Sequence, residues 1–393
     1  MPMSDPVVDL QARRPSGPDE PLDRLRVLLE LLNRPDRSVP TVWVGGAHGK
    51  SSVITMVAAL FAAFDVTAGA ATAPHLQDMR ERLRIAGEAI TAETLRTTLR
   101  YLDPFLREVD TRYPLPLTFD EVLHALAATW FADAPVDVAV FEGTTDATGR
   151  RDVVVRLDPS ATSVTGGDRQ DRVLGMDFGV AERRVAVGGQ QVTLRGATAE
   201  VADVYLPLHG AHQADNAATA LAAVEAFLGY SGGLDAELIR GAFASVRLPG
   251  RLEVVRREDA ASVLLDGARD ARSATALAAA LRSEFTVRNR IGVLALVGHD
   301  PAPVVQALAG ALDHLVVAPA AVPDAAGPDE VLAAAQEAGM AVEAADTIPA
   351  ALELASGVAT IEDAVVVTGG LQTVGAARRA LGLAPADDLL HTS

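Results

Sequence analysis

A short apolar run that leads through a glycine-rich turn into a helix-forming stretch constrains this chain more than any other feature. The run TVWV occupies 41–44, the turn GGAHGKSS follows it directly, and helix-forming residues continue from 51 to 64. A strand that turns through Gly-x-x-Gly-Lys-Ser into a helix points backbone N–H groups and the helix N-terminus at one place, where an anion can bind. The segment therefore predicts an α/β fold with a phosphate-binding turn.

The turn contains the only lysine of the chain, Lys50, whereas all other cationic side chains are arginine. A lysine retained in an arginine-rich chain indicates a position that a guanidinium cannot fill, here a point charge on the outer phosphates of a nucleotide. We expect Ser51 or Ser52 to offer a hydroxyl to Mg²⁺, and we place Gly46 and Gly49 in the same nucleotide site. A valine stands at the first glycine position of the standard spacing, so a glycine-rich connection without a ligand is the alternative.

The composition excludes several classes of protein. Without cysteine, the chain cannot form disulfides, thiolate metal sites or a cysteine nucleophile. Lys and Arg total 34 against 52 Asp and Glu, a net charge of −18 that repels phosphate backbones, so we expect no nucleic-acid partner. No apolar run reaches the ~20 residues of a bilayer span, and the N-terminus lacks a basic segment before an apolar core. We expect a cytoplasmic protein without a membrane partner.

Apolar and amphipathic segments alternate along the chain and predict two α/β domains. The first, which contains the glycine-rich turn, spans 21–246, and a second α/β unit spans 247–393. Residues 1–20 are rich in Pro, Asp and Arg and are predicted to form a disordered tail. Polar turns are predicted for 143–170, and short strands joined by two glycines for 178–206.

Segments between about residue 24 and residue 382 match the motifs of one enzyme family in chain order. The matching segments are GGAHGKSS at 45–52, APHL at 73–76, RLRI at 82–85, TFDE at 118–121, VDVAVFE at 136–142, LPLHGAHQADN at 206–216, PGRLE at 249–253, LDGA at 265–268 and VTGGLQTVG at 367–375. They resemble the motifs of folylpolyglutamate synthases and dihydrofolate synthases, relatives of the Mur ligases. The resemblance implies a P-loop, Mur-ligase-like central domain and a smaller Rossmann-like C-terminal α/β domain, with a nucleotide in the cleft between them.

This family joins a carboxylate to an amino acid, typically glutamate, through an acyl phosphate made from ATP. The ligands that the resemblance implies are ATP, Mg²⁺, a folate-type or other small carboxylate, and an amino acid. By the same resemblance, Lys50 and Ser52 serve phosphate and Mg²⁺. Glu142 is a metal ligand and Arg251 contacts the phosphates, so both join Lys50 as predicted catalytic residues. The structural alternatives are that Glu142 caps a helix and that Arg251 pairs with Glu253.

Further contacts follow from the same resemblance. His212 and Asn216 would contact the adenine, and Asp266 the nucleotide across the domain cleft. The residues assigned to the substrate are His75, Arg82 and Glu121. Alternatively, His212 and Asn216 cap a helix N-terminus, and Asp266 is a turn residue at a strand end. His75 could equally be an ordinary loop histidine.

Departures from the family pattern fall on positions that handle the metal and the γ-phosphate. His48 stands where the family has asparagine, and Gln170 where it has a metal-binding histidine. A neutral amide is a poor substitute for imidazole as a ligand. The block that carries a carbamylated lysine in the family is absent, and Arg269 and Asp270 replace the His and Asn of LDGAHNP.

These departures leave two functions open. The leading hypothesis is a nucleotide-binding homologue with a degenerate ligase site, non-catalytic or strongly impaired, which could partner an intact paralogous ligase. The alternative is an active, divergent ATP-dependent ligase that joins folate or another acid to an amino acid. Whether the chain is an enzyme depends on ATP turnover, which these residues do not specify.

Overall fold

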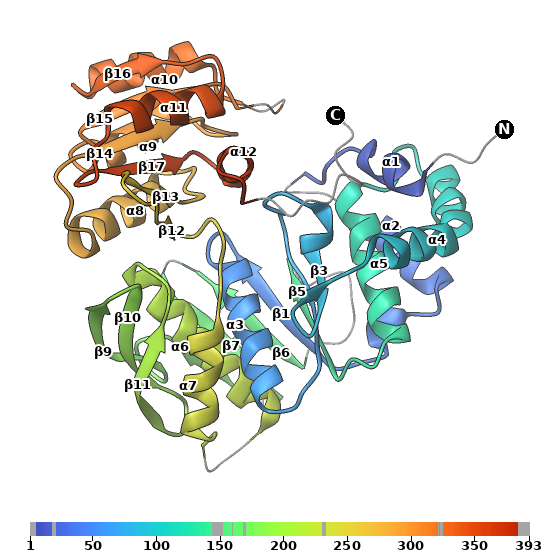
Figure 1. Ribbon diagram of the computed structural model, residues 1–393. Helices are drawn as coiled ribbons and strands as arrows, with labels where there is room; N and C mark the ends of the chain where they lie inside the picture. The colour runs from blue at the N-terminus through green and yellow to red at the C-terminus, as the bar shows by residue number, and fades with distance from the viewer. Residues whose placement is uncertain are drawn as a thin grey trace.

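The computed structural model describes residues 5–17, 21–143, 152–158, 160–167, 170–229, 233–320, 322 and 325–383 (Figure 1). It confirms the predicted α/β class. A mixed sheet is covered by helices on both faces, and a second, largely parallel sheet has its own helices. The part of the predicted turn region at 144–151 lies outside the described residues.

The first sheet is centred on β1 (Thr41–Gly46), which pairs in parallel with β5 (Val138–Glu142) and β6 (Val153–Leu157). The remaining strands are β2 (Ala68–Ala71), β3 (Leu83–Ile85), β4 (Glu88–Ala89), β7 (Ser163–Thr165) and β8 (Asp171–Val173), in the order β4-β3-β2-β5-β1-β6-β7-β8. An apolar run without alternation suits the central position, because a central strand is buried on both faces.

The strand β6 corrects the prediction of polar turns for 143–170. Val153, Val154 and Val155 are buried beside β1, and β7 continues the sheet from β6. A strand buried on both faces shows no polar–apolar alternation. A run of 5 residues inside a polar stretch therefore gives little signal in the sequence.

Helices cover both faces of this sheet (Figure 1). They are α2 (Asp23–Leu31), α3 (Lys50–Ala63), α4 (Ala92–Arg112), α5 (Phe119–Asp133), α6 (Ala211–Leu228) and α7 (Ala236–Ser245). Val42 and Val44 pack in one buried cluster with α3, α6 and α7. Trp43 points to the opposite face and packs with α2, α4 and α5. Alternate side chains of one strand thus serve two cores.

A short helix near the N-terminus, α1 (Pro6–Gln11), corrects the prediction of a disordered tail. Val7 and Leu10 are buried in the cluster that contains α4, and Arg13 forms an ion pair with Asp110 at 2.8 Å. A helix of 6 residues is too short to be stable alone, so its order depends on the surface that it packs against. The polar, proline-rich composition of this segment does not indicate that such a surface exists.

The segment 178–206 forms the predicted short strands. They are β9 (Gly179–Ala186), β10 (Gly189–Arg195) and β11 (Glu200–Leu206), paired antiparallel in the order β11-β10-β9. This small sheet contacts α6 and α7. Because α6 follows β11 closely in the chain, the sheet helps to fix where α6 begins.

The second sheet fits the Rossmann-like unit that the resemblance implies. Its strands are β12 (Glu253–Val255), β13 (Ser262–Leu265), β14 (Arg290–Leu294), β15 (His314–Val317), β16 (Ala341–Ala344) and β17 (Ala364–Thr368), in the order β12-β13-β17-β14-β15-β16. All pairs are parallel except β12 with β13. The helices are α8 (Ala271–Glu284), α9 (Pro301–Leu308), α10 (Pro328–Glu337), α11 (Ile348–Val358) and α12 (Leu371–Ala380). The first three pack on one face and the last two on the other.

The two domains touch at several places. Glu284, at the end of α8, accepts from Gly210 N at 3.1 Å and forms an ion pair with Arg183 of β9. Arg378 of α12 donates to Gln77 Oε1 at 3.0 Å. These contacts hold the C-terminal domain against the first domain, next to the glycine-rich turn (Figure 1).

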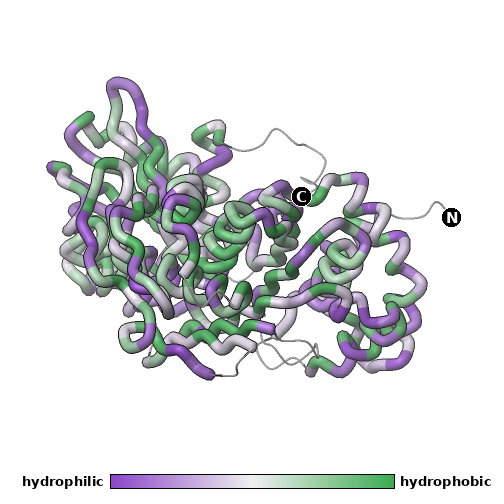
Figure 2. Tube along the Cα trace, turned by 90° about the horizontal axis from the view of Figure 1, so that it is seen from below, coloured by the Kyte–Doolittle hydropathy of each residue, from purple (hydrophilic) through white to green (hydrophobic). Residues whose placement is uncertain are grey.

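Hydrophobic segments lie mostly toward the middle of the molecule and hydrophilic segments mostly toward its outside (Figure 2). Within the described ranges, no helix is long and apolar enough to cross a membrane.

Candidate active site

A cleft with a volume of about 440 Å³ lies between the two domains. Its lining comes from the turn between β1 and α3, the end of β5, the start of α6 and the segment that leads from β13 into α8. In α/β sheets, ligands bind beyond the carboxyl ends of the strands, which is where β1 and β5 meet the cleft. The volume is within the usual range for small-molecule sites.

The turn between β1 and α3 depends on two glycines. Gly46 has φ of +129° and Gly49 has φ of +80°, conformations that other residues rarely adopt. A Cβ atom would lie 2.3 Å from the Leu157 carbonyl oxygen at Gly46, and 2.7 Å from Asn216 Oδ1 at Gly49. Gly49 is the N-cap of α3, and no side chain in the described ranges caps this helix. The first N–H groups of α3 are therefore available to an anion.

Lys50 lies at the first position of α3 and connects the turn to β5. Its Nζ donates to Gly46 O at 2.8 Å and lies 3.6 Å from Glu142 Oε1. Glu142 Oε2 accepts from Ala73 N at 2.9 Å. Burial raises the pKa of Glu142, while the Ala73 N–H and the Lys50 charge act in the opposite direction. The carboxylate thus faces Lys50 and the cleft instead of capping a helix.

Ser52 and Glu142, the predicted magnesium ligands, both carry oxygen atoms and lie at the cleft near Lys50. Ser52 is buried and lines the cleft together with Glu142. A hydroxyl and a carboxylate are hard oxygen ligands, which Mg²⁺ combines with phosphate oxygens and water. Gln170, at the position of the metal-binding histidine of the family, is exposed and does not line the cleft. Across the part of the chain that the structure describes, no group of three or more His, Asp or Glu could hold a metal ion.

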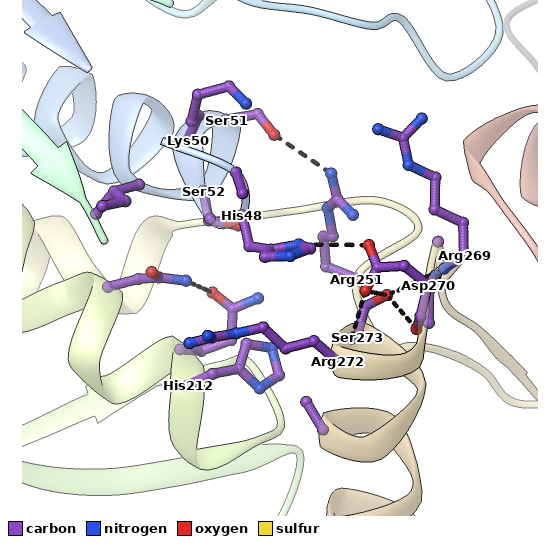
Figure 3. A pocket seen from close by; sticks show the side chains of 18 of the residues that line it. His48, Lys50, Ser51, Ser52, His212, Arg251, Arg269, Asp270, Arg272 and Ser273 are labelled. Carbon is purple, nitrogen blue, oxygen red and sulfur yellow. Dashed lines mark hydrogen bonds and ion pairs between the residues drawn. The ribbon is translucent and has the colours of Figure 1, made fainter. Parts of the chain in front are cut away.

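Arg251 reaches from the C-terminal domain to the turn. Its Nη2 donates to Ser51 Oγ at 3.3 Å (Figure 3). Burial lowers the pKa of this guanidinium, and the charge of Asp266 opposes that shift. Glu253, the alternative partner of Arg251, forms an ion pair with Arg378 instead. Arg251 is therefore a cleft residue that links the two domains.

Asp266, at the end of β13, lies beside Arg251. Its Oδ2 accepts from Leu252 N at 2.9 Å, and its Oδ1 accepts from Ala268 N at 2.9 Å. Burial raises the pKa of Asp266, while Arg251 lowers it. Asp266 is thus a turn residue at the end of a strand, and it also lines the cleft.

The start of α6 brings His212 and Asn216 to the cleft. Gly210 is the N-cap of α6, so neither residue caps the helix. Burial lowers the pKa of His212 to about 4, so its ring is neutral at pH 7. Asn216 Nδ2 donates to Gln213 Oε1 at 3.0 Å, and its Oδ1 lies against Gly49. Both side chains could contact a ligand that is bound at the turn and extends toward α6.

The start of α8 contributes cleft residues that the sequence analysis does not assign to the site, namely Arg269, Asp270, Arg272 and Ser273 (Figure 3). Asp270 caps α8 by accepting from Ser273 N at 2.9 Å, and its Oδ2 lies 3.7 Å from His48 Nδ1. The signal for these residues is the replacement of the family's His and Asn by Arg and Asp. From the sequence alone, that replacement indicates only the loss of two family residues.

His75 and Arg82 contact each other but do not line the cleft. Arg82 Nε donates to His75 Nδ1 at 3.0 Å, and Arg82 Nη1 donates to Asp120 Oδ1 at 3.0 Å. The Arg82 guanidinium lies 4.8 Å from the centroid of the Phe119 ring. Burial lowers the pKa of His75 to about 4, which keeps the ring neutral and able to accept from Arg82.

Glu121 is held inside the first domain and does not line the cleft. Its Oε2 accepts from Thr118 N at 2.8 Å and forms an ion pair with Arg24 at 3.1 Å. The Glu121 and Arg24 side chains are only 4% and 7% exposed. The structure gives Glu121 a role in capping α5 and joining it to α2, and does not bring it together with the other predicted site residues.

Comparisons with known proteins identify relatives that span nearly the whole chain. A family model described as Mur ligase, glutamate ligase domain, matches residues 250–371. A dihydrofolate synthase/folylpolyglutamate synthase of Mycobacterium tuberculosis is 33% identical over 448 residues, covering 93% of this chain and 91% of the relative. The structure of Mycobacterium tuberculosis folylpolyglutamate synthase complexed with ADP has a TM-score of 0.88 and 32% identity, covering 97% of this chain and 99% of that one. E. coli FolC in complex with DHPP and ADP shares the fold, with a TM-score of 0.79, 21% identity and 96% of each chain covered.

Proposed function

The chain belongs to the folylpolyglutamate and dihydrofolate synthase family of Mur ligases, and on that premise we propose that it is an ATP-dependent ligase that joins a small acid to an amino acid. One observation carries the proposal. Lys50 lies at the head of α3 between Gly46 O and Glu142, while Arg251 faces the same turn from the other domain. Cations on two sides and a free helix N-terminus are what a transferring phosphoryl group requires.

The proposed reaction has two steps. A carboxylate oxygen of the acid attacks the γ-phosphorus of ATP, the bond from that phosphorus to the bridging oxygen breaks, and ADP leaves with the bond electrons. The amine of the amino acid then attacks the acyl carbon of the acyl phosphate. The amide forms as inorganic phosphate leaves, and the amine gives up one proton.

The residues of the cleft would position the reactants and neutralise charge. Lys50 and Arg251 would hold phosphate oxygens from opposite domains, and Ser52 and Glu142 would hold Mg²⁺. When bound, Mg²⁺ supplies charge stabilisation at the phosphates. The neutral ring of His212 would lie on the adenine side, because α6 borders the turn there.

A folate-type acid and glutamate are the first substrates to test. Support comes from the names of the relatives and from the matched glutamate ligase domain. Arg82 and His75 stay the predicted contacts of the acid, next to Phe119, whose ring lies under the Arg82 guanidinium. A flat pterin ring bound there would contact both an aromatic ring and a cationic group.

The second candidate is a nucleotide-binding homologue whose ligase turnover is lost or strongly impaired, with an intact paralogous ligase as its partner. The observation in its favour is Gln170, which is exposed and lies outside the cleft lining. The single lysine also leaves no residue to replace the carbamylated lysine of the family. The alignment with the M. tuberculosis relative spans 448 residues, more than the 393 of this chain, so that relative contains segments that this chain lacks. Losing transition-state contacts reduces turnover more than it reduces nucleotide binding.

Calorimetry with Mg²⁺-ATP, followed by ADP release in the same samples, separates the two functions. Dihydropteroate or tetrahydrofolate with glutamate is added in the second step. We expect the wild type to bind ATP and to release ADP only with both substrates, and Lys50→Ala to lose binding. Arg282→Ala removes an exposed arginine of α8 that does not line the cleft, and should match the wild type.

Binding without ADP release from any acid–amino acid pair would favour the second candidate. Failure of the wild type to bind ATP at all would contradict both.

A further inference from the structure

Two arginines of the C-terminal domain, Arg269 and Arg272, lie at the cleft, where the charge of Arg272 also acts on Asp158 of the lining. Both line the cleft, and both are exposed. Among the residues that the structure describes, neither guanidinium has a hydrogen bond or ion pair. The chain has 52 acidic against 34 basic residues, so carboxylates are plentiful as partners. Two guanidiniums left unpaired beside a cavity indicate an anionic ligand.

The start of α8 holds these two arginines in place. Asp270, between them, caps the helix by accepting from Ser273 N at 2.9 Å, and Ser273 Oγ accepts from Asp270 N at 3.1 Å. This reciprocal capping box fixes the backbone from which both arginines extend. Their positions are therefore set by the fold, although their guanidiniums are exposed.

Both arginines extend from the start of α8 into the cleft, Arg272 toward His212 and Arg269 on the side of Arg251 (Figure 3). His48, in that turn, lies 3.7 Å from Asp270 Oδ2, so the start of α8 and the turn are close. Burial is the main cause that lowers the pKa of His48; the charge of Asp270 opposes it, and the positive charges of Arg272 and Arg269 lower the pKa further. The charges of both arginines therefore reach the glycine-rich turn.

The other cations of the cleft are already balanced. Lys50 Nζ lies 3.6 Å from Glu142 Oε1, and the charge of Arg251 is opposed by Asp266. A triphosphate at the turn needs further positive charge, and the described residues hold no group of three or more His, Asp or Glu that could bind a further metal ion. Guanidiniums are suited to phosphate because they donate two parallel hydrogen bonds.

We propose that Arg269 and Arg272 form an arginine clamp, supplied by the C-terminal domain, that binds the terminal phosphates of the nucleotide at the turn. The inference rests on the proposed function, because it requires a nucleotide there. It goes further in assigning the neutralisation of the β- and γ-phosphates to guanidiniums of α8. It also gives a reason for the replacement of His and Asn by Arg and Asp in this chain.

The test is calorimetric titration of the full chain with Mg²⁺-ATP, ADP and AMP. The variants are Arg269→Ala, Arg272→Ala and, as matched control, Arg282→Ala on the same helix; Lys50→Ala reports on the turn. Loss of one charge-assisted contact should weaken ATP binding about tenfold for each clamp variant. AMP, which lacks the terminal phosphates, should bind all three arginine variants as it binds the wild type. Because Arg269 and Arg272 are exposed, the variants should keep the wild-type thermal midpoint.

Other results would overturn the clamp. If Lys50→Ala abolishes ATP binding while both clamp variants bind ATP within twofold of the wild type, the proposed function stands and the clamp is wrong. If AMP binding falls as much as ATP binding, the arginines contact the nucleoside end and not the terminal phosphates. If the wild type binds none of the three nucleotides, the proposed function and the clamp fail together.

Discussion

Replacing Glu121 with alanine tests whether this residue supports the fold or the substrate. Its carboxylate is the charged partner of Arg24, and the two side chains are 4% and 7% exposed. Removing one partner of a buried ion pair costs about 3–5 kcal/mol, because the remaining charge stays buried. For a domain of this size, each kcal/mol lowers the thermal midpoint by about 2–4 °C, so we expect Glu121→Ala to lower it by roughly 6–20 °C.

Urea unfolding followed by tryptophan fluorescence measures the loss of unfolding free energy in the first domain, which contains Glu121. Both tryptophans, Trp43 in β1 and Trp130 in α5, belong to the first domain, so the signal reports on it alone. Glu121→Gln keeps the capping acceptor and loses the charge, and should be intermediate. Glu108→Ala is the control, because its ion pair with Arg112 is exposed and contributes less than about 1 kcal/mol. The reasoning is refuted if Glu121→Ala unfolds like the wild type but binds the acid substrate more weakly.

Three further perturbations follow from the geometry. Gly49→Ala should weaken ATP binding at least tenfold in calorimetry, since a Cβ atom would lie 2.7 Å from Asn216 Oδ1 and the left-handed φ adds ~1–2 kcal/mol of strain. The control is Gly87→Ala, which should bind ATP normally, because Gly87 also has a positive φ, +85°, but faces open space. Burial lowers the pKa of His124 to about 4, below its unfolded value of 6.5, so the free energy of unfolding should fall as pH drops from 6.5 to 4, by up to about 1.4 kcal/mol per pH unit. His124→Phe should flatten that pH dependence in urea titrations, and an unchanged slope would count against the assignment. Leu10→Ala should cost about 2–3 kcal/mol, whereas an unchanged urea midpoint would support a disordered N-terminal tail.

The strand, turn and helix around Lys50 could be predicted because every residue of that unit is a neighbour along the chain. The same holds for the alternating strands and helices after β12, whose apolar runs are long and separated by clear breaks. The strand β6 and the helix α1 were not predicted. The first is a short run buried on both faces, and the second is ordered only by the surface beneath it.

The sequence by itself determined the family motifs, the order of the elements and the candidate nucleotide residues, because these depend on residue type and local spacing. Only the tertiary structure decided which of them meet. Arg251 and Ser51 are 200 positions apart and touch because the two domains pack against each other. The same packing brings Arg269 and Arg272 to the cleft, while Glu121 is buried against Arg24 in the first domain. A periodic pattern reports which face of an element is buried, but the distance between two elements is set by the packing of the whole chain.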